Sequence, residues 1–189
     1  IGQFRDLDRP DRVVWVRGFK DMASRPKALD AFYTSAIWQK HRTAANATMI
    51  DVDDVLLLRP LKPLAVGKRP QDEAATGLVE VTVYAFDASV DAETIAHFNN
   101  DIETAGAHAI ASYVTEQSAN NYPRLPIREN ENVLVRFAAF ASIEAYDTHR
   151  ARLAAAPQAQ ARAKRLRTKL KSDPQILKLT PTARSLTHG

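Results

Sequence analysis

The sequence predicts an α+β protein whose two halves repeat one arrangement of strands and a helix. Two valine-rich strands carry an arginine at the same place, Val14-Trp15-Val16-Arg17 and Val133-Leu134-Val135-Arg136. A helical pattern follows each strand, and a further strand that reaches a proline follows each helix. The separation is 43 residues from Arg17 to Pro60 and 45 residues from Arg136 to Pro181. Three matched features at nearly equal spacing indicate an internal duplication.

The second half, residues 78–189, contains strand and helix patterns in the order βαββαβ, which is the ferredoxin-like plan. Leu78–Phe86 alternates apolar and polar residues as a strand does. Asp91 precedes a helical pattern that ends near Gly106. The remaining expected elements are a strand at 110–115, the Arg136 strand, a helix from Ile143, a basic helix at 160–171 and a strand at 176–181.

The first half, residues 1–60, shows only ββαβ. Its elements are a short strand at Ile1–Phe4, the Arg17 strand within Val13–Phe19, a helical region at 25–46 and a strand at 55–59. The opening strand and helix have no counterpart here, so we expect a segment of about the length of 78–110 before Ile1. Residues 61–77, rich in proline, glycine and charge, are expected to link the two domains.

Each arginine strand has two different faces, because side chains alternate along a strand. Trp15, Arg17 and Phe19 share one face, and Val14 and Val16 share the other. We expect the small β-branched face to pack under the helices and the arginine face to point away from them. Two such sheets packed face to face would cover the arginine faces. The expected fold is therefore a dimeric α+β barrel lined by both arginines.

Two interpretations of these arginines stay open. A buried guanidinium is costly unless it is paired or hydrogen-bonded. Arg17, with Trp15 beside it, could hold a carboxylate or another anion against an aromatic wall. Alternatively, Arg17 and Arg136 could lie at the barrel rim and pair with protein carboxylates.

Four motifs of the first half resemble the bacterial NIPSNAP family. They are W-x-R-x-F at 15–19, F-Y-x-x-x-x-W-x-x-H-R at 32–42, A-N-A-T at 45–48 and D-x-V-L-L-L-R-P at 53–60. The segment Asn120–Phe140 also resembles this family. The resemblance implies tandem ferredoxin-like domains of the dimeric α+β barrel superfamily and a homodimer, but no defined activity. Other members of that superfamily bind heme, act as cofactor-free monooxygenases or bind small molecules.

The helix with the second motif supplies most candidate site residues. Tyr33 and His41 could move a proton, and Trp38 and Arg42 could contact a ligand together with Trp15, Arg17 and Arg136. A helix with aromatic core residues and a half-exposed His41 is the structural alternative. Heme-degrading relatives place a tryptophan ten residues before a comparable histidine, where this chain has Ala31. We therefore expect no cofactor, with heme as the alternative.

Composition excludes several other classes. The sequence lacks cysteine, which excludes thiol nucleophiles and cysteine-bound metals, and its histidines show no metal-ligand spacing. A net charge of +4 with 22 interspersed acidic residues gives little reason to expect nucleic acid, and no apolar run is long enough to span a bilayer. We expect a cytoplasmic homodimer that binds a small organic ligand in a barrel cavity, needs no metal and contacts no membrane. Alternatively, it is a cofactor-independent monooxygenase or isomerase acting on an aromatic or acidic substrate, or an interaction module without a ligand.

Overall fold

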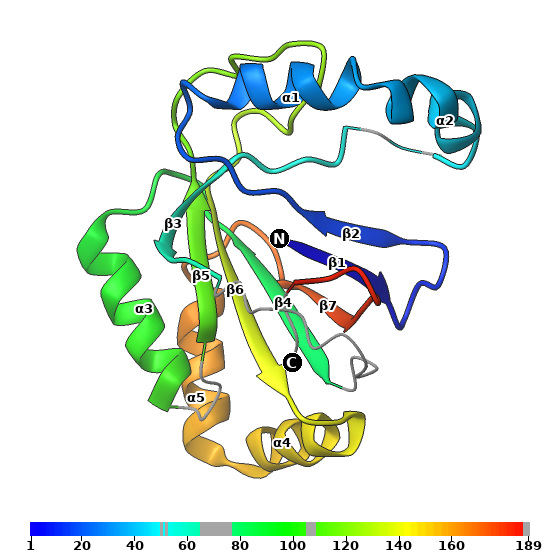
Figure 1. Cartoon of the computed structure of the whole chain (residues 1–189). Coiled ribbons are helices and arrows are strands. Elements are labelled where there is room, and N and C mark those ends of the chain that lie inside the picture. The colour runs from blue at the N-terminus through cyan, green and yellow to red at the C-terminus, as the bar shows by residue number, and fades with distance from the viewer. Residues whose placement is uncertain (50, 52, 65–76, 105–108, 187–189) are drawn as a thin grey trace. The chain divides into compact units, whose positions relative to one another are not determined.

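A computed structural model describes residues 1–49, 51, 53–64, 77–104 and 109–186 of the chain. Figure 1 shows the helices and strands in chain order. They are β1 (Gly2–Asp6), β2 (Val13–Val16), α1 (Arg25–Tyr33), α2 (Ala36–Ala47), β3 (Leu58–Lys62), β4 (Leu78–Ala85), α3 (Ala92–Thr104), β5 (Ala109–Thr115), β6 (Val133–Phe140), α4 (Ile143–Ala155), α5 (Pro157–Arg167) and β7 (Gln175–Pro181).

Seven strands form one sheet in the order β2-β1-β7-β4-β6-β5-β3, and this sheet is curled (Figure 1). Its inner part, β7-β4-β6-β5, has the strand order of a βαββαβ unit, as predicted for the second half. The strands of the first half extend this same sheet, β1 and β2 at one end and β3 at the other. The mixed α+β class is confirmed, and the tandem domains stay a prediction.

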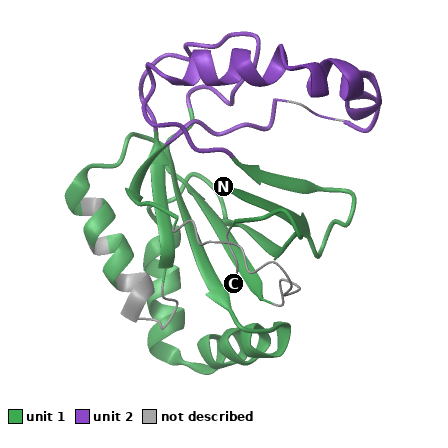
Figure 2. Ribbon diagram, viewed as in Figure 1, with its two compact units in different colours: residues 1–16, 59–115, 131–189 green, residues 17–58, 116–130 purple. Residues whose placement is uncertain are grey.

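The chain divides into two compact units, shown in Figure 2. Unit 1 consists of Ile1–Val16, Arg59–Thr115 and Glu131–Gly189 and contains almost the whole sheet with α3, α4 and α5. Unit 2 consists of Arg17–Leu58 and Glu116–Asn130 and contains α1 and α2. Arg17 is therefore the first residue of unit 2.

Two predicted strands differ from the observed ones. Strand β2 ends at Val16, so Arg17 and Phe19 lie beyond the strand that was predicted to include them. Strand β3 covers Leu58–Lys62 rather than 55–59, and it contains Pro60 instead of ending there. Because β3 is the last strand of the sheet, the absent N–H of Pro60 can face away from the ladder.

The predicted helices are confirmed with changed limits. The helical region 25–46 is two helices, since the chain is extended at Ser35, and the basic helix is Pro157–Arg167 rather than 160–171. Residues 65–76 of the predicted linker, and Gly106, lie outside the described residues.

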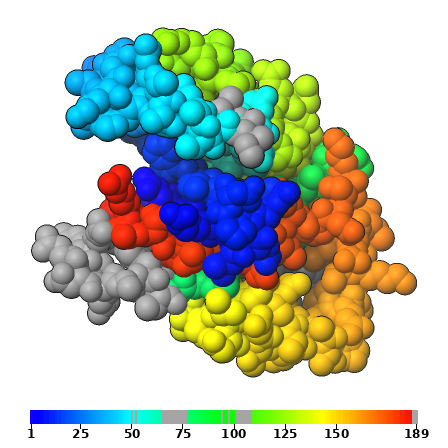
Figure 3. Space-filling view, turned by 90° about the vertical axis from the view of Figure 1, so that its right-hand side faces the viewer, coloured from blue at the N-terminus to red at the C-terminus, as the bar shows by residue number. Residues whose placement is uncertain are grey.

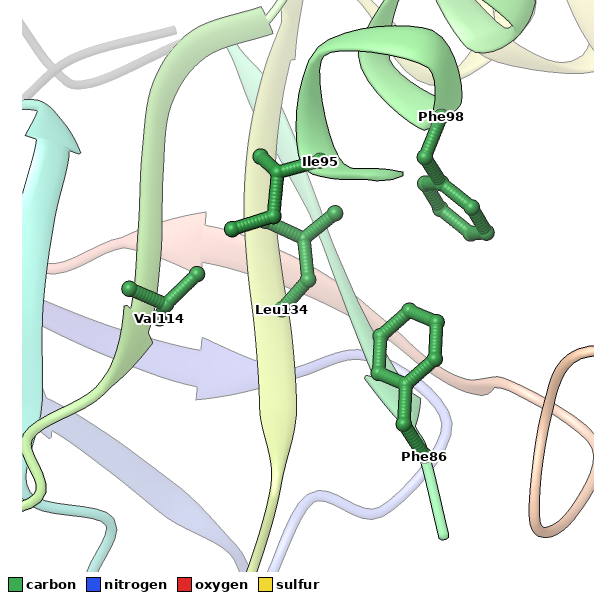
Figure 4. Close-up of a cluster of buried hydrophobic side chains, with 5 residues drawn as sticks. All are labelled: Phe86, Ile95, Phe98, Val114 and Leu134. Carbon is green, nitrogen blue, oxygen red and sulfur yellow. The ribbon is translucent and has the colours of Figure 1, made fainter. Parts of the chain in front are cut away.

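One face of the sheet, here called the helix face, packs against the helices of unit 1. Leu134 of β6 and Val114 of β5 contact Ile95 and Phe98 of α3 in a buried cluster that also contains Phe86 (Figure 4). Phe98 meets the rings of Tyr84 and Phe86 edge-on at centroid distances of 4.7 and 5.5 Å. Tyr146 of α4 meets Phe140 in the same way at 5.2 Å. Large side chains on this face bridge the distance between the sheet and the helices.

The opposite face, here called the inner face, is packed with apolar side chains, many of them valines. Registers β4–β6 and β4–β7 place Val81 beside Phe137 and Leu177 there, and β1–β2 places Phe4 beside Val14. Tyr113 also lies on this face, where its hydroxyl accepts a hydrogen bond from the Leu64 N–H at 2.8 Å. Buried residues of the inner face include Phe4, Val79, Val81, Val83, Ala111, Val133, Val135, Phe137 and Leu179.

The predicted face assignment is therefore wrong in the second half, where Leu134 packs against α3. Leu134 and Arg136 alternate onto the helix face, and Trp15, which pairs with Gln3 of β1, lies on that side too. The valines predicted to pack under the helices point to the inner face. The reason is that alternation separates the two faces of a strand but does not decide which face the helices cover.

Arg136 is buried at the centre of the sheet, with 5% of its surface exposed. It pairs across the strands with Thr82 of β4 and Ser112 of β5. Burial raises the pKa of the nearby Tyr84 hydroxyl, and the positive charge of Arg136 partly opposes that rise. Arg136 thus belongs to a polar group beneath the helices and not to the lining of a barrel.

A second polar group lies where α4 meets the sheet. Burial, and then the carboxylate of Glu80, raise the pKa of Tyr146 to about 12. His149 is also buried, 5.3 Å from the Phe140 ring, and its Nδ1 accepts a hydrogen bond from Arg152 Nη2 at 3.3 Å. Burial, and then the charge of Arg152, lower the pKa of His149. The fold therefore favours a neutral imidazole at this position.

Leu134 and Trp15 occupy matched positions of the repeat, but we expect their replacement by alanine to lower the free energy of unfolding by different amounts. Leu134→Ala opens a cavity under α3 and should lower the free energy of unfolding by about 2–5 kcal/mol. Trp15→Ala should cost roughly 1–2 kcal/mol, since about half of that residue is already in water. Urea denaturation of both variants measures the difference, and equal losses would contradict the assignment of Leu134 to the core.

The free energy of unfolding should decrease as the pH drops, because the folded chain keeps His149 neutral. Its pKa is lowered in the folded chain, so below about pH 6.5 the unfolded chain takes up this proton first and the free energy of unfolding decreases. Glu80 opposes the lowered pKa, while Arg150 and Arg152 support it. The decrease between about pH 7 and pH 5 should be smaller in His149→Gln, measured by urea denaturation at each pH. An unchanged pH slope would show that His149 is not held neutral.

Candidate functional site

The candidate site is a group of aromatic rings around Arg17 in unit 2, here called the Arg17 cluster (Arg17, Phe32, Tyr33 and Trp38). Arg17 Nη1 donates a hydrogen bond to the Tyr33 hydroxyl at 3.2 Å. The guanidinium carbon lies 5.1 Å from the Phe32 ring centre and 5.6 Å from that of Tyr33, within the range of cation–π attraction. Trp38 lies against both rings, at 5.2 Å from Phe32 and 5.3 Å from Tyr33.

The break between α1 and α2 brings these rings together. At the end of α1 the Thr34 hydroxyl donates to the Asp30 carbonyl at 2.7 Å, and Ser35 donates to that of Phe32 at 2.7 Å. Ser35 is extended and caps α2, its side chain accepting from the Trp38 N–H at 3.2 Å. Trp38 thus lies in the first turn of the new helix and reaches back to the last residues of α1.

A long loop, residues 116–130, forms one wall of the cluster. Tyr122 of this loop is buried, and its ring stacks on Tyr33 with centroids 6.3 Å apart and planes at 13°. The Tyr122 hydroxyl donates to Asp30 Oδ1 at 2.8 Å. The hydrogen bond to Asp30, and then burial, raise the pKa of Tyr122. The Tyr33 ring is therefore held between Tyr122 and Trp38.

Arg25 fixes this loop to the start of α1. Only 2% of Arg25 is exposed, and its Nη1 donates to Asn120 Oδ1 at 2.9 Å and to Asn121 Oδ1 at 3.0 Å. Asn121 Nδ2 in turn donates to the Met22 carbonyl at 2.6 Å, and Asn120 Nδ2 to that of Leu125 at 3.0 Å. Both amides are thus oriented with their oxygens toward the guanidinium.

Two arginines of this region, Arg17 and Arg25, act on each other electrostatically. Burial lowers the pKa of Arg25, and the positive charge of Arg17 lowers it further, so the two cations repel each other. The acceptors named for Arg25 are carboxamide oxygens, which carry no net charge. An anion beside Arg17 would reduce this repulsion, and the rings of the cluster could stack on a planar apolar part of the same molecule.

The predicted site residues are brought together only in part. Arg17, Tyr33 and Trp38 form the cluster, whereas His41 and Arg42 are exposed on α2. Trp15 and Arg136 belong to unit 1. Phe32, Asp30 and Arg25 were not predicted. The F-Y pair of the helix motif could have drawn attention to Phe32, but no local pattern connects Arg25 with the loop.

Two shallow hollows occur elsewhere on the described surface. One, of about 260 Å³, is lined by Phe86, Val90, Asp91 and Lys169 among others. The other, of about 270 Å³, is lined by Asp51, Asp53, Asp54, Ile127 and Arg128, where Arg128 pairs with Asp54 at 3.3 Å. Among the described residues, no group of three or more histidine, aspartate or glutamate side chains is arranged to hold a metal ion. Neither hollow includes a residue of the Arg17 cluster.

Among the helices of the described chain, none has the length and apolar character needed to cross a bilayer.

Comparisons with known proteins find solved structures to which this chain is similar. One is a protein of Lactobacillus acidophilus NCFM named "putative monooxygenase", with 16% identity over 100% of this chain and 78% of that chain, and a TM-score of 0.51. Another, with the same name, is from Fusobacterium nucleatum, with 13% identity over 82% of this chain and 64% of that chain, and a TM-score of 0.42. No family model matches the sequence. No curated protein matches it either. At such identities the first structure supports the α+β fold alone.

Replacing Arg25 should loosen the loop and leave the sheet unchanged. Arg25→Met removes two hydrogen bonds and leaves two amide oxygens without their donor, a loss of about 1–3 kcal/mol. Amide hydrogen exchange across residues 118–130 should become faster in this variant, while exchange in β4 and β6 stays the same. Arg124→Met, at an exposed arginine of the same loop, is the control. Equal protection in both variants would show that Arg25 does not fix the loop.

Proposed function

We propose that this chain is a NIPSNAP-like α+β barrel protein that binds a small organic acid with an aromatic part at the Arg17 cluster. The tandem ferredoxin-like domains (1–60 and 78–189) and the homodimer implied by the family resemblance are parts of the same proposal. The observation that carries it is the position of the Arg17 guanidinium against two aromatic rings, beside a second, buried arginine.

The ligand is placed at the Arg17 cluster and not inside the sheet. The inner face of the described sheet is filled with buried valine, phenylalanine and leucine side chains, as the core of a small barrel is. Arg136, the second arginine of the repeat, lies on the other face. Arg17 and Tyr33, by contrast, are half-buried, so a small molecule can reach their polar atoms from solvent.

The homodimer has support from helix α2. None of its residues is buried, and Ile37, near its start, is 78% exposed. A helix of this kind gains little from its own chain, and apolar residues exposed on a helix often mark a contact with another chain.

Binding of matched ligands tests the proposal. Benzoate and phenylacetate should raise the melting temperature of the chain, and benzamide, which has the same shape without the charge, should raise it much less. Arg17→Ala removes charge-assisted hydrogen bonds worth about 1.5–3 kcal/mol, so benzoate should bind roughly ten- to a hundred-fold more weakly by calorimetry. Arg17→Lys should recover part of the affinity, because it keeps the charge but not the planar fork.

Arg59→Ala is the control for this experiment, since Arg59 is an exposed arginine of β3 outside the cluster. It should bind benzoate as the unmodified chain does. If benzoate and benzamide stabilise the chain equally, or if Arg17→Ala binds benzoate with unchanged affinity, the Arg17 cluster is not an acid-binding site.

A second candidate function is an enzyme, such as a cofactor-independent monooxygenase or an isomerase acting on an aromatic or acidic substrate. The hydrogen bond from Arg17 to the Tyr33 hydroxyl favours it, because it fixes the position of a hydroxyl that could exchange a proton with a bound substrate. The fold shared with the Lactobacillus protein gives further support. Turnover that is lost in Tyr33→Phe, while benzoate still binds, would distinguish this function from binding alone.

A further inference from the structure

Positive charge is concentrated in one segment of unit 1, residues 148–172. The segment contains eight lysine and arginine residues and no aspartate or glutamate. The rest of the chain contains 18 lysines and arginines against 22 aspartates and glutamates, so its formal charge is negative. The net charge of +4 therefore conceals a strongly basic segment. Its cations are Arg150, Arg152, Arg162, Lys164, Arg165, Arg167, Lys169 and Lys171.

The way α5 packs turns most of these cations toward solvent. Leu166 and Leu170 pack against the buried cluster that contains Phe98 and Leu134, so the apolar side of the segment is already covered within unit 1. Figure 3 shows the residues that follow α4, in orange, along the right-hand edge of the molecule, with side chains that project outward. The exposed cations of this surface, here called the basic patch, are Lys164, Arg165, Arg167, Lys169 and Lys171.

The stability of α5 accounts for only part of this charge. Lys164, Arg165 and Arg167 lie in the last turn of α5, where a cation gains about 0.3–1 kcal/mol from the helix dipole. Lys169 and Lys171 lie beyond that turn, where the dipole has little effect. Arg167 pairs with Asp173 at 3.4 Å, but both side chains are exposed, and a pair in water contributes little. The patch thus carries more charge than its own fold uses.

The composition of the patch favours one class of partner. The described residues of 157–171 expose no large apolar or aromatic side chain. The core of a protein interface is rich in such side chains, and a helix that lies in a membrane surface buries its apolar face in the lipid. Single-stranded nucleic acid stacks its bases on aromatic rings. Contact with the phosphates of a duplex, by contrast, requires only cations.

We propose that the basic patch binds the phosphate backbone of a nucleic acid duplex without reading its sequence. The long side chains of Lys164, Arg167 and Lys171 reach the phosphates, and binding releases the counterions that surround them. Affinity of this kind is moderate and falls steeply as the salt concentration rises. The patch belongs to unit 1 and the Arg17 cluster to unit 2, so the proposal holds whether or not that cluster binds an acid.

Fluorescence anisotropy of a labelled DNA duplex, measured over a range of salt concentrations, tests the proposal. Lys164→Gln/Lys171→Gln changes the patch, and Lys27→Gln/Lys40→Gln, at exposed lysines of α1 and α2, is the control with the same net charge. The slope of log Kd against log salt should become less steep by about two in the patch variant and change little in the control. Duplexes of unrelated sequence, and duplex RNA, should bind with similar affinity.

Hydrogen exchange of the unmodified chain gives a second measurement that needs no variant. Added duplex should slow amide exchange within residues 160–172 and leave it unchanged in α1 and α2. Equal loss of affinity in the two lysine variants would overturn the proposal, since net charge alone would then explain binding. Tighter binding of a single strand of the same length, or no binding of the duplex at low salt, would do so too. Binding to phosphatidylserine vesicles but not to the duplex would identify a membrane as the partner instead.

Discussion

The pairing of β4 with β6 is the interaction on which the rest of unit 1 depends. The two strands pair along eight residues, from Leu78 with Phe140 to Ala85 with Val133. Because side chains alternate, this one register sets both faces at once. It places Leu134 under α3 and Phe137 beside Val81 on the inner face. A slip of one residue would move valines under the helices and arginine into the inner face, so packing on both sides selects the same register.

The order of strands and helices could be predicted from local sequence patterns. Which face of each strand packs against the helices could not. Alternation in Leu78–Phe86 and the matched arginine strands were sufficient to predict the βαββαβ order and its strand positions. Alternation also separates Trp15 from Val14 correctly. It does not say which of the two sets is enclosed, since that depends on the curvature of the whole sheet and on where helices lie. The error for Leu134 and Arg136 arose at that step.

The residues of the candidate site could also be predicted only in part, because some of their contacts join segments far apart in the sequence. Arg17, Tyr33 and Trp38 were predictable because one strand end and one helix motif carry them. Arg25 was not, because its partners Asn120 and Asn121 are about a hundred residues away and no periodicity relates them. Only the fold shows that the loop at residues 116–130 holds Tyr122 against Tyr33. Contacts between segments far apart in the chain cannot be predicted from the local patterns of a single sequence.

The two arginines of the repeat show that equivalent positions need not keep equivalent roles. Arg136 continues a strand that pairs on both sides, so its guanidinium is enclosed among Thr82, Ser112 and Tyr84 under the helices. Burying a guanidinium removes it from water at a cost in free energy, so it requires polar neighbours on the sheet. Among the strands that the structure describes, β2 pairs with β1 alone, and it ends at Val16, which allows the chain to leave the sheet before Arg17. The guanidinium then meets Phe32 and Tyr33 and stays accessible from solvent. An arginine on a strand that pairs on both sides is therefore enclosed in the packed sheet, whereas an arginine beyond the end of an edge strand stays accessible to a ligand.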